Sequence, residues 1–341
     1  MAMVNPFDVF SVTEIAAAIN RVPNNYGRIN QLGLMPVRGT TSRTVAVEER
    51  NGSLALIPTE RAGNDGSGRG PGNVGKTGKR KLRTFSVPNL TYDEFVGPEE
   101  VQGVRAFGGS DQQNLASLLN EKLANARAKH DITLEHLRMG ALKGIIVDAD
   151  GSTLYNLYTE FDITAKEVDF VLGTGTTDIK AKCHAVKRHI EDNLLGETMT
   201  GVRVLVSPEF FDALTNHQKV QKAFENWQAA QDRLGGDMRN GFTFGGLTFE
   251  EYRGVSTDPA GNTRRFIADG EGHAFPEGTQ QTFRTHVAPA DFNEAVGQMG
   301  QVYYAKTQPA KFDRGWDVHT QSNPLPLCHR PGVLVKLTTS N

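Results

Sequence analysis

The sequence predicts an α+β protein whose long elements and extensions a single copy could not easily bury by itself. Three observations carry this prediction: a long uninterrupted helical pattern, a glycine-rich loop flanked by strand patterns, and a run of short strands beyond Gly236. With 341 residues, the chain is long enough for one large domain or two ordinary domains with a buried core.

Composition and charge exclude several classes of protein. There are 37 basic and 39 acidic residues, which gives a net charge of -2. We therefore expect that the surface as a whole does not bind nucleic acid or anionic lipid. Cys183 and Cys328 lie far apart, which argues against a disulfide scaffold or a multi-cysteine zinc site and fits a reducing compartment. No secretory signal opens the chain, and no apolar stretch approaches the ~18 residues that a membrane helix needs. We expect a soluble protein made in the cytosol, with no membrane partner.

The N-terminal region predicts an arm followed by strands. Ser11 and Glu14 form a capping box that opens a short helix. Residues 44–48 and 53–57 read as strands of a β-hairpin that turns at Asn51-Gly52.

A glycine-rich loop follows, from Arg61 to Arg83. Residues 82–87 then alternate as a returning strand before Pro88. The whole of 44–88 therefore predicts a long two-stranded projection with a glycine-rich end.

This loop is strongly basic. Its cationic residues are Arg61, Arg69, Lys76, Lys79, Arg80, Lys81 and Arg83, against the single acid Asp65. Such a cluster can contact nucleic-acid phosphates, remain solvated, or pair with acidic groups of another subunit, for which Asp93, Glu94, Glu99 and Glu100 are candidates. We favour a subunit contact made by the cluster from Arg69 to Arg83, because the loop lacks the interleaved aromatic residues that stack bases.

The same loop contains a match to the phosphate-binding P-loop motif, Gly70 to Thr77, with Lys76 in the lysine position. A P-loop follows a buried strand and opens a helix whose N-terminus faces the phosphates. Here a polar, glycine-rich stretch precedes the motif and a basic strand pattern follows it, so neither flank is present. We interpret the match as accidental and keep a nucleotide hydrolase using Lys76 as the alternative function.

The strongest local pattern predicts a long helix over 110–142. Ser110 and Gln113 form a capping box, and the next Gly or Pro is Gly140. The helix is either straight or bent near residues 130–133. At ~1.5 Å per residue it would span roughly 45 Å, more than a compact domain usually needs, so we expect a spine.

The second half of the chain predicts a hairpin over 145–155 that turns at Asp150-Gly151, and a helix over 178–195. A buried strand at 202–206 leads into a helix over 208–234, with Asn216 as a candidate break. Further short strands are expected at 242–252, 264–268, 282–287, 302–306 and 333–337.

Few residues suggest chemistry. Asp148 to Gly151 resembles the start of a calcium loop, but the later oxygen ligands and the closing Glu are absent, so a hairpin turn is expected. Cys183, His184 and His189 share one predicted helix and do not converge as metal ligands. The motifs of serine hydrolases and zinc proteases do not occur. We therefore expect no catalytic residues, no metal and no cofactor.

Three stretches resemble the major capsid proteins of tailed bacteriophages, in particular the family of the phage lambda head protein E. They are residues 140–146 with 148–151, residues 275–279 followed by 288–291, and residues 322–327 before Pro331. The resemblance covers most of the chain.

The resemblance implies the Hong Kong 97-type capsid fold and a division of the chain into five parts. These would be an N-terminal arm at 1–43, an extended loop at 44–88, a peripheral domain at 89–160 with a spine helix at 110–142, a mainly axial domain at 161–290, and C-terminal strands at 291–341 that return to the peripheral domain. It implies no active site.

The function implied is a shell protein that assembles through pentamers and hexamers around double-stranded DNA. Its partners would be other copies of the chain, the packaged DNA on the inner face, and portal, scaffold and decoration proteins. It would be made in the bacterial cytoplasm and reside in the virion capsid. The rival functions are the hydrolase using Lys76 and another phage structural or DNA-binding component.

Overall fold

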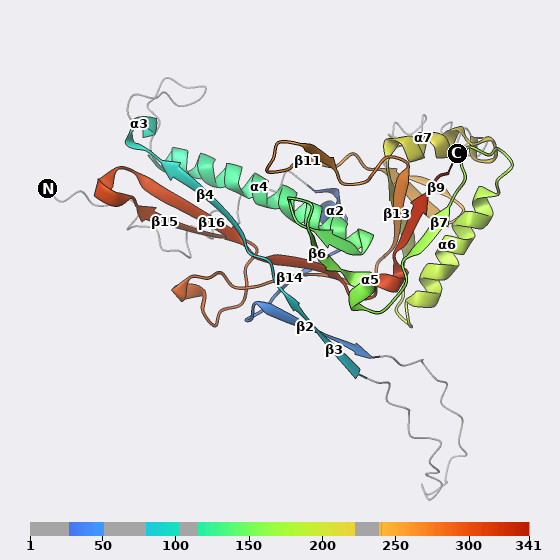
Figure 1. Ribbon diagram of the computed structural model, residues 1–341, viewed down its shortest axis with the longest axis horizontal. Helices are drawn as coiled ribbons and strands as arrows, with labels where there is room; N and C mark the ends of the chain where they lie inside the picture. Colours follow the sequence, from blue (N-terminus) through green and yellow to red (C-terminus); the bar gives the residue numbers. More distant parts are fainter. Residues whose placement is uncertain (1–26, 51–79, 102–114, 222–238, 240, 341) are drawn as a thin grey trace, which may run out of the picture.

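The computed structural model describes residues 27–50, 80–101, 115–221, 239 and 241–340 (Figure 1). A long helix, α4, has a three-stranded sheet beside it and a six-stranded sheet near its C-terminal end (Figure 1). Helices and strands do not alternate regularly along the chain, which confirms the α+β class.

Helix α4 (Leu115–Lys143) runs without interruption, so the expected spine is one helix and residues 130–133 do not break it. The start predicted at Ser110 lies outside the described residues. Several charged side chains on α4 are buried. Arg127 Nε lies 3.2 Å from Asp131 Oδ2, whereas Glu135 accepts from Ile29 N and Arg138 donates to Asn30 Oδ1. The helix ends at Gly144, whose φ of 79° favours glycine and whose missing Cβ makes room for the Tyr158 ring.

The six-stranded sheet has the order β7-β18-β13-β8-β10-β9. These strands are Lys166–Asp169, Val335–Thr338, Glu271–Glu277, Gly201–Val206, Leu247–Glu251 and Phe242–Phe244. The predicted buried strand is β8, which lies near the middle of the sheet, parallel to β10 and antiparallel to β13.

Two helices accompany this sheet (Figure 1). Helix α6 (Ile179–Asn193) buries Ile179, Cys183, Val186 and Ile190, the apolar face that the sequence predicts. Helix α7 (Pro208–Asn216) is capped by Ser207, and it ends where His217 adopts an extended backbone. The predicted break at Asn216 is thus confirmed, whereas a single helix over 208–234 is wrong.

Two three-stranded sheets complete the body. The first, β15-β16-β4, joins Tyr304–Pro309, Trp316–Ser322 and Leu90–Val96 beside α4 (Figure 1), and α3 (Pro98–Val101) follows β4. The second, β1-β14-β17, joins Val37–Gly39, Phe283–Val287 and Pro324–Cys328. Because β1 pairs with β14 and Ile29 of α2 (Arg28–Gln31) is fully buried, the end of the predicted arm packs on the body.

Smaller elements agree in part with the sequence. The hairpin β5–β6 (Ile145–Val147 and Thr153–Asn156) forms as predicted and leads into α5 (Leu157–Glu160). Strand β12 (Thr263–Arg265), which forms a hairpin with β11 (Val255–Thr257), is shorter than the strand expected at 264–268. Single 3-10 turns occur at Asn293–Ala295, Lys311–Asp313 and Pro331–Val333.

Strands β2 (Thr44–Arg50) and β3 (Arg80–Ser86) pair antiparallel along their whole length and form a ribbon that projects from the body (Figure 1). This confirms the predicted returning strand. The helix expected after Ser11, the strand at 53–57 with its Asn51-Gly52 turn, and the glycine-rich loop lie outside the described residues. No helix in the described part of the chain is long and apolar enough to cross a membrane.

Candidate subunit interface

The β2–β3 ribbon is held at its base by aromatic packing. Phe85 is buried, and its ring lies 5.3 Å from that of Tyr155 and 6.2 Å from that of Phe161, between ring centres. The Tyr155 hydroxyl donates to Ser86 O and accepts from Ser86 N, both at 2.8 Å. These contacts fix the point at which the ribbon leaves the body.

Two of the predicted basic residues lie next to this base and are paired within the chain. Lys81 Nζ and Arg83 Nη2 lie 2.9 and 3.5 Å from Asp162 Oδ2. The hydrogen bond from Lys81 lowers the pKa of Asp162, helped by the charges of both cations. The Arg83 guanidinium also lies over the Phe161 ring, 4.9 Å from its centre. These two cations therefore anchor the ribbon to its own subunit.

Four other predicted cations precede Lys81 in the sequence. Arg80 begins β3, and its side chain is not among those described; Arg69, Lys76 and Lys79 lie in the loop outside the described residues. The P-loop-like motif lies there too.

The acidic residues proposed as partners lie on another element, around the end of β4. Lys122 of α4 lies 3.6 Å from Glu94 and 3.1 Å from Glu100, between charged atoms. Asp93 pairs with His319 of β16. Glu99 is exposed. The structure therefore does not bring the described basic and acidic residues together within one chain.

Exposed apolar side chains mark further contact surface that the sequence did not single out. Leu82 on the ribbon is 70% exposed, and Phe312, at the tip of the β15–β16 hairpin, is 87% exposed. Phe312 has a φ of 64°, a backbone conformation that a bulky residue rarely adopts. An apolar residue between charged residues in a turn, as in Lys311-Phe312-Asp313, is the signal that could have found it.

The cysteine, histidine and acidic side chains singled out in the sequence do not come together in the described part of the chain. Burial raises the pKa of the Cys183 thiol to about 12, and His189 Nε2 lies 3.0 Å from Gly332 O rather than facing Cys183. Asp150 and Gly151 form the β5–β6 turn, as predicted in place of a calcium loop. Within the described ranges, no three His, Cys, Asp or Glu side chains are placed to hold a metal ion.

Comparison with known proteins decides the family. The family model described as phage major capsid protein E matches residues 11–339. The chain belongs to this family. The major capsid protein of Pseudomonas phage KPP10 is 32% identical, and the match covers 96% of each chain. That of Salmonella phage Felix O1 is 29% identical over 96% of this chain and 95% of the relative.

Solved structures place this major capsid protein in the Hong Kong 97-type fold. A crystal structure described as a prophage capsid protein from E. coli CFT073 has a TM-score of 0.59 at 14% identity, covering 97% of this chain and 99% of that one. A phage-related protein from Bordetella bronchiseptica RB50 has a TM-score of 0.51 at 11% identity, covering 95% of both chains. The chain is thus a structural protein of the phage virion, and many copies of it build the icosahedral head shell.

Proposed function

We propose that five or six copies of this capsid protein form rings, and that the rings close into a shell around double-stranded DNA. Contacts between unlike surfaces generate a ring whenever the rotation between subunits closes. The β2–β3 ribbon is the observation that carries the proposal, because its two strands project from the body (Figure 1). The proposed parts are the arm at 1–43, extended loop at 44–88, peripheral domain at 89–160, axial domain at 161–290 and C-terminal strands at 291–341.

The described part of the ribbon lacks contacts that a neighbouring subunit could supply. An isolated two-stranded sheet is at best marginally stable in water. Within the described part of the chain, β2 and β3 pair only with each other, and Leu82 points an apolar side chain into solvent. A neighbouring subunit that covers Leu82 and pairs with Arg69, Lys76, Lys79 and Arg80 would supply the missing contacts.

The proposal includes no enzymatic activity. Strand β3 begins at Arg80, four positions after Lys76, whereas a P-loop lysine begins a helix. Lys76→Ala should therefore leave nucleotide binding and hydrolysis unchanged. Magnesium-dependent ATP binding that this substitution abolishes would instead support the hydrolase.

Portal, scaffold and decoration proteins are proposed as further partners, with DNA against the inner face. The test of the shell itself is light scattering and electron microscopy of the purified protein, alone and co-expressed with its phage partners. We expect closed shells of uniform size. Compact monomers alone, under conditions in which phage heads mature, would contradict the proposal, and open tubes would indicate a tail component.

A further inference from the structure

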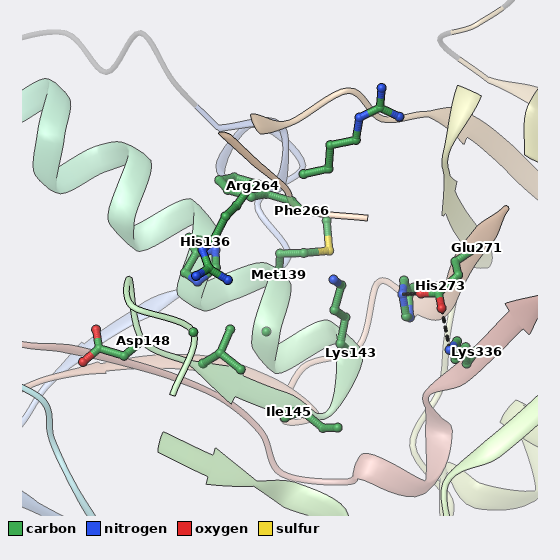
Figure 2. A pocket seen from close by; sticks show the side chains of 14 residues that line it. His136, Met139, Lys143, Ile145, Asp148, Arg264, Phe266, Glu271, His273 and Lys336 are labelled. Atoms are coloured by element: carbon green, nitrogen blue, oxygen red, sulfur yellow. Dashed lines mark ion pairs between the residues drawn. The ribbon is translucent and has the colours of Figure 1, made fainter. Parts of the chain in front are cut away.

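A pocket of about 450 Å³ lies where the C-terminal half of α4 meets the six-stranded sheet and the β5–β6 and β11–β12 hairpins (Figure 2). We call it the α4–β13 pocket. Its lining includes His136, Met139 and Lys143 of α4, Phe266 after β12, His273 of β13 and Lys336 of β18. Its size is in the range of small-molecule sites.

Lys143, on the last turn of α4, is part of the pocket lining. Figure 2 shows its side chain pointing into the space between His136 and His273. Within the described ranges, no carboxylate lies within ion-pairing distance of its ammonium group. Burial lowers the pKa of Lys143, although the more distant Glu271 partly offsets this. Lys143 is partly buried, and a partly buried ammonium without a close counter-ion favours an anion beside it.

The two histidines add unpartnered nitrogens. His136 Nε2 and His273 Nε2 are both buried without a hydrogen-bond partner, and His273 is only 5% exposed. Burial lowers the pKa of His273 to about 3 and lowers that of His136, so both rings are neutral at pH 7. His136 donates to backbone carbonyls near Asp148, which leaves Nε2 as an acceptor.

Other charged groups of the lining already have partners. Lys336 Nζ lies 2.6 Å from Glu271 Oε1, and Arg264 Nε lies 3.0 Å from Asp258 Oδ2. Arg265 pairs with Glu209 and Asp269. Asp148 accepts from Ala149 N at 2.7 Å, and its carboxylate points away from Lys143 (Figure 2). Glu271 Oε2 lies 3.8 Å from His273 Nε2, so Lys143 and His136 Nε2 remain to bind a ligand.

We propose that the α4–β13 pocket binds a phosphate monoester. Bound as its monoanion, a phosphate monoester accepts from Lys143 and donates its remaining hydroxyl to His136 Nε2, whereas a carboxylate can only accept. The volume exceeds that of a phosphate alone, and Met139, Ile145 and Phe266 form an apolar wall for the organic part. The monoester comes either from a free nucleotide or from the 5′ end of a nucleic acid. This proposal does not depend on the subunit contact proposed for the β2–β3 ribbon.

The test is isothermal titration of unassembled subunits and of shells with inorganic phosphate and with adenosine monophosphate. We expect saturable binding at one site per chain in both preparations. Lys143→Met should weaken binding about tenfold or more, since it removes a charge-assisted hydrogen bond and keeps the side-chain length. Lys306→Met, which removes an exposed lysine paired with Glu294, is the matched control and should leave binding within about twofold.

Further variants separate the parts of the ligand. Ile145→Ala should weaken binding of adenosine monophosphate but not of inorganic phosphate. Lys76→Ala should change neither, which separates the pocket from the P-loop-like motif. His136→Phe, which removes the ring nitrogens, repeats the test should Lys143→Met fail to fold.

Oligonucleotides with and without a 5′ phosphate distinguish the two sources. Lys143-dependent binding of the phosphorylated form alone supports a nucleic-acid end, and binding restricted to the mononucleotide supports a free nucleotide. Three results would overturn the proposal: no saturable binding, binding that neither Lys143→Met nor His136→Phe weakens, or binding by subunits that is lost in shells. The last would show that a group of a neighbouring subunit fills the pocket.

Discussion

The six-stranded sheet and the β2–β3 ribbon are stabilised in opposite ways. In the sheet, β8 is paired on both edges, and Val204 and Leu205 are fully buried. In the ribbon, two strands pair with each other, and beyond Phe85 the side chain of Leu82 is 70% exposed. The sheet finds its packing contacts within one chain, whereas the described part of the ribbon finds them only at its base.

This difference separates the part of the subunit that folding alone stabilises from the part that we expect assembly to stabilise. Buried apolar area stabilises the body of the subunit, roughly in proportion to the area removed from water. In the described part of the ribbon, Val45, Val47 and Phe85 are buried, at the end next to the body. Phe85 packs there on Tyr155 and Phe161. Changes in the sheet should therefore alter the stability of the subunit, and changes in the outer ribbon should alter the shell.

The largest expected effect is in the sheet. Phe249 of β10 is fully buried, and its ring centre lies 6.4 Å from that of Phe170. Phe249→Ala should lower the free energy of unfolding of the unassembled subunit by about 3–5 kcal/mol, because it leaves a cavity. Denaturant titration followed by circular dichroism measures this. Phe312→Ala, at an 87% exposed phenylalanine, is the matched control and should leave the free energy of unfolding unchanged. An equal loss of unfolding free energy in both variants would contradict the difference between the buried and the exposed phenylalanine.

The same contrast explains what could be predicted from the sequence. β8 and α6 were predictable because a continuous apolar run and a 3.6-residue period report burial directly. β13 was not, because Glu271–Glu277 contains Gly272 and Pro276 and is nevertheless buried by its neighbours β8 and β18.

The interface was only partly predictable. Alternating apolar and polar residues and the glycine content predicted the ribbon, and the cluster of basic residues predicted a contact with another subunit. No local pattern could show that Lys81 and Arg83 meet Asp162, because the two elements are about eighty positions apart in the sequence. The α4–β13 pocket was missed for the same reason: its residues come from α4, β13 and β18.

The second effect is on assembly. Reversal of Arg69, Lys76, Lys79 and Arg80 to Glu should lower the yield of shells about tenfold or more, because like charges would face each other in every ring. The subunit should keep its circular dichroism spectrum and its unfolding midpoint. Lys81 is left out, since it pairs with Asp162 of its own chain.

The control for this variant exchanges Arg and Lys at the same four positions and should assemble normally. Raised salt should weaken the wild-type contact wherever it is exposed to solvent. Normal shells from the reversed variant that fail only to retain DNA would place the four charges against the genome instead.

Acid should destabilise the body through its buried histidines. Burial lowers the pKa of His273 to about 3 and that of His286 and His329 to about 4, against 6.5 for an ordinary histidine. The unfolded chain therefore binds more protons below pH 6.5, and the free energy of unfolding should fall as the pH drops from 6.5 toward 4. His273→Gln should flatten this dependence in denaturant titrations across that range. A pH profile identical to that of the wild type would show that His273 is not buried in its neutral form.

The smallest effect is at the ribbon base. Asp162→Ala removes an exposed partner of Lys81 and Arg83, and such pairs contribute little to stability. The unfolding midpoint should barely change, while amide hydrogen exchange in β3 should become faster. Asp269→Ala, which removes an exposed partner of Arg265, should leave β3 exchange as it is. Unchanged exchange in both variants would mean that aromatic packing alone holds the base.

The most direct test of the central claim is a cryo-electron microscopy map of the assembled shell, traced through residues 44–88. We predict that the outer ribbon lies on a neighbouring subunit, with Leu82 covered and with Arg69, Lys76, Lys79 and Arg80 near acidic side chains of that neighbour. A ribbon folded back on its own subunit, or one whose tip points into the packaged DNA, would contradict it.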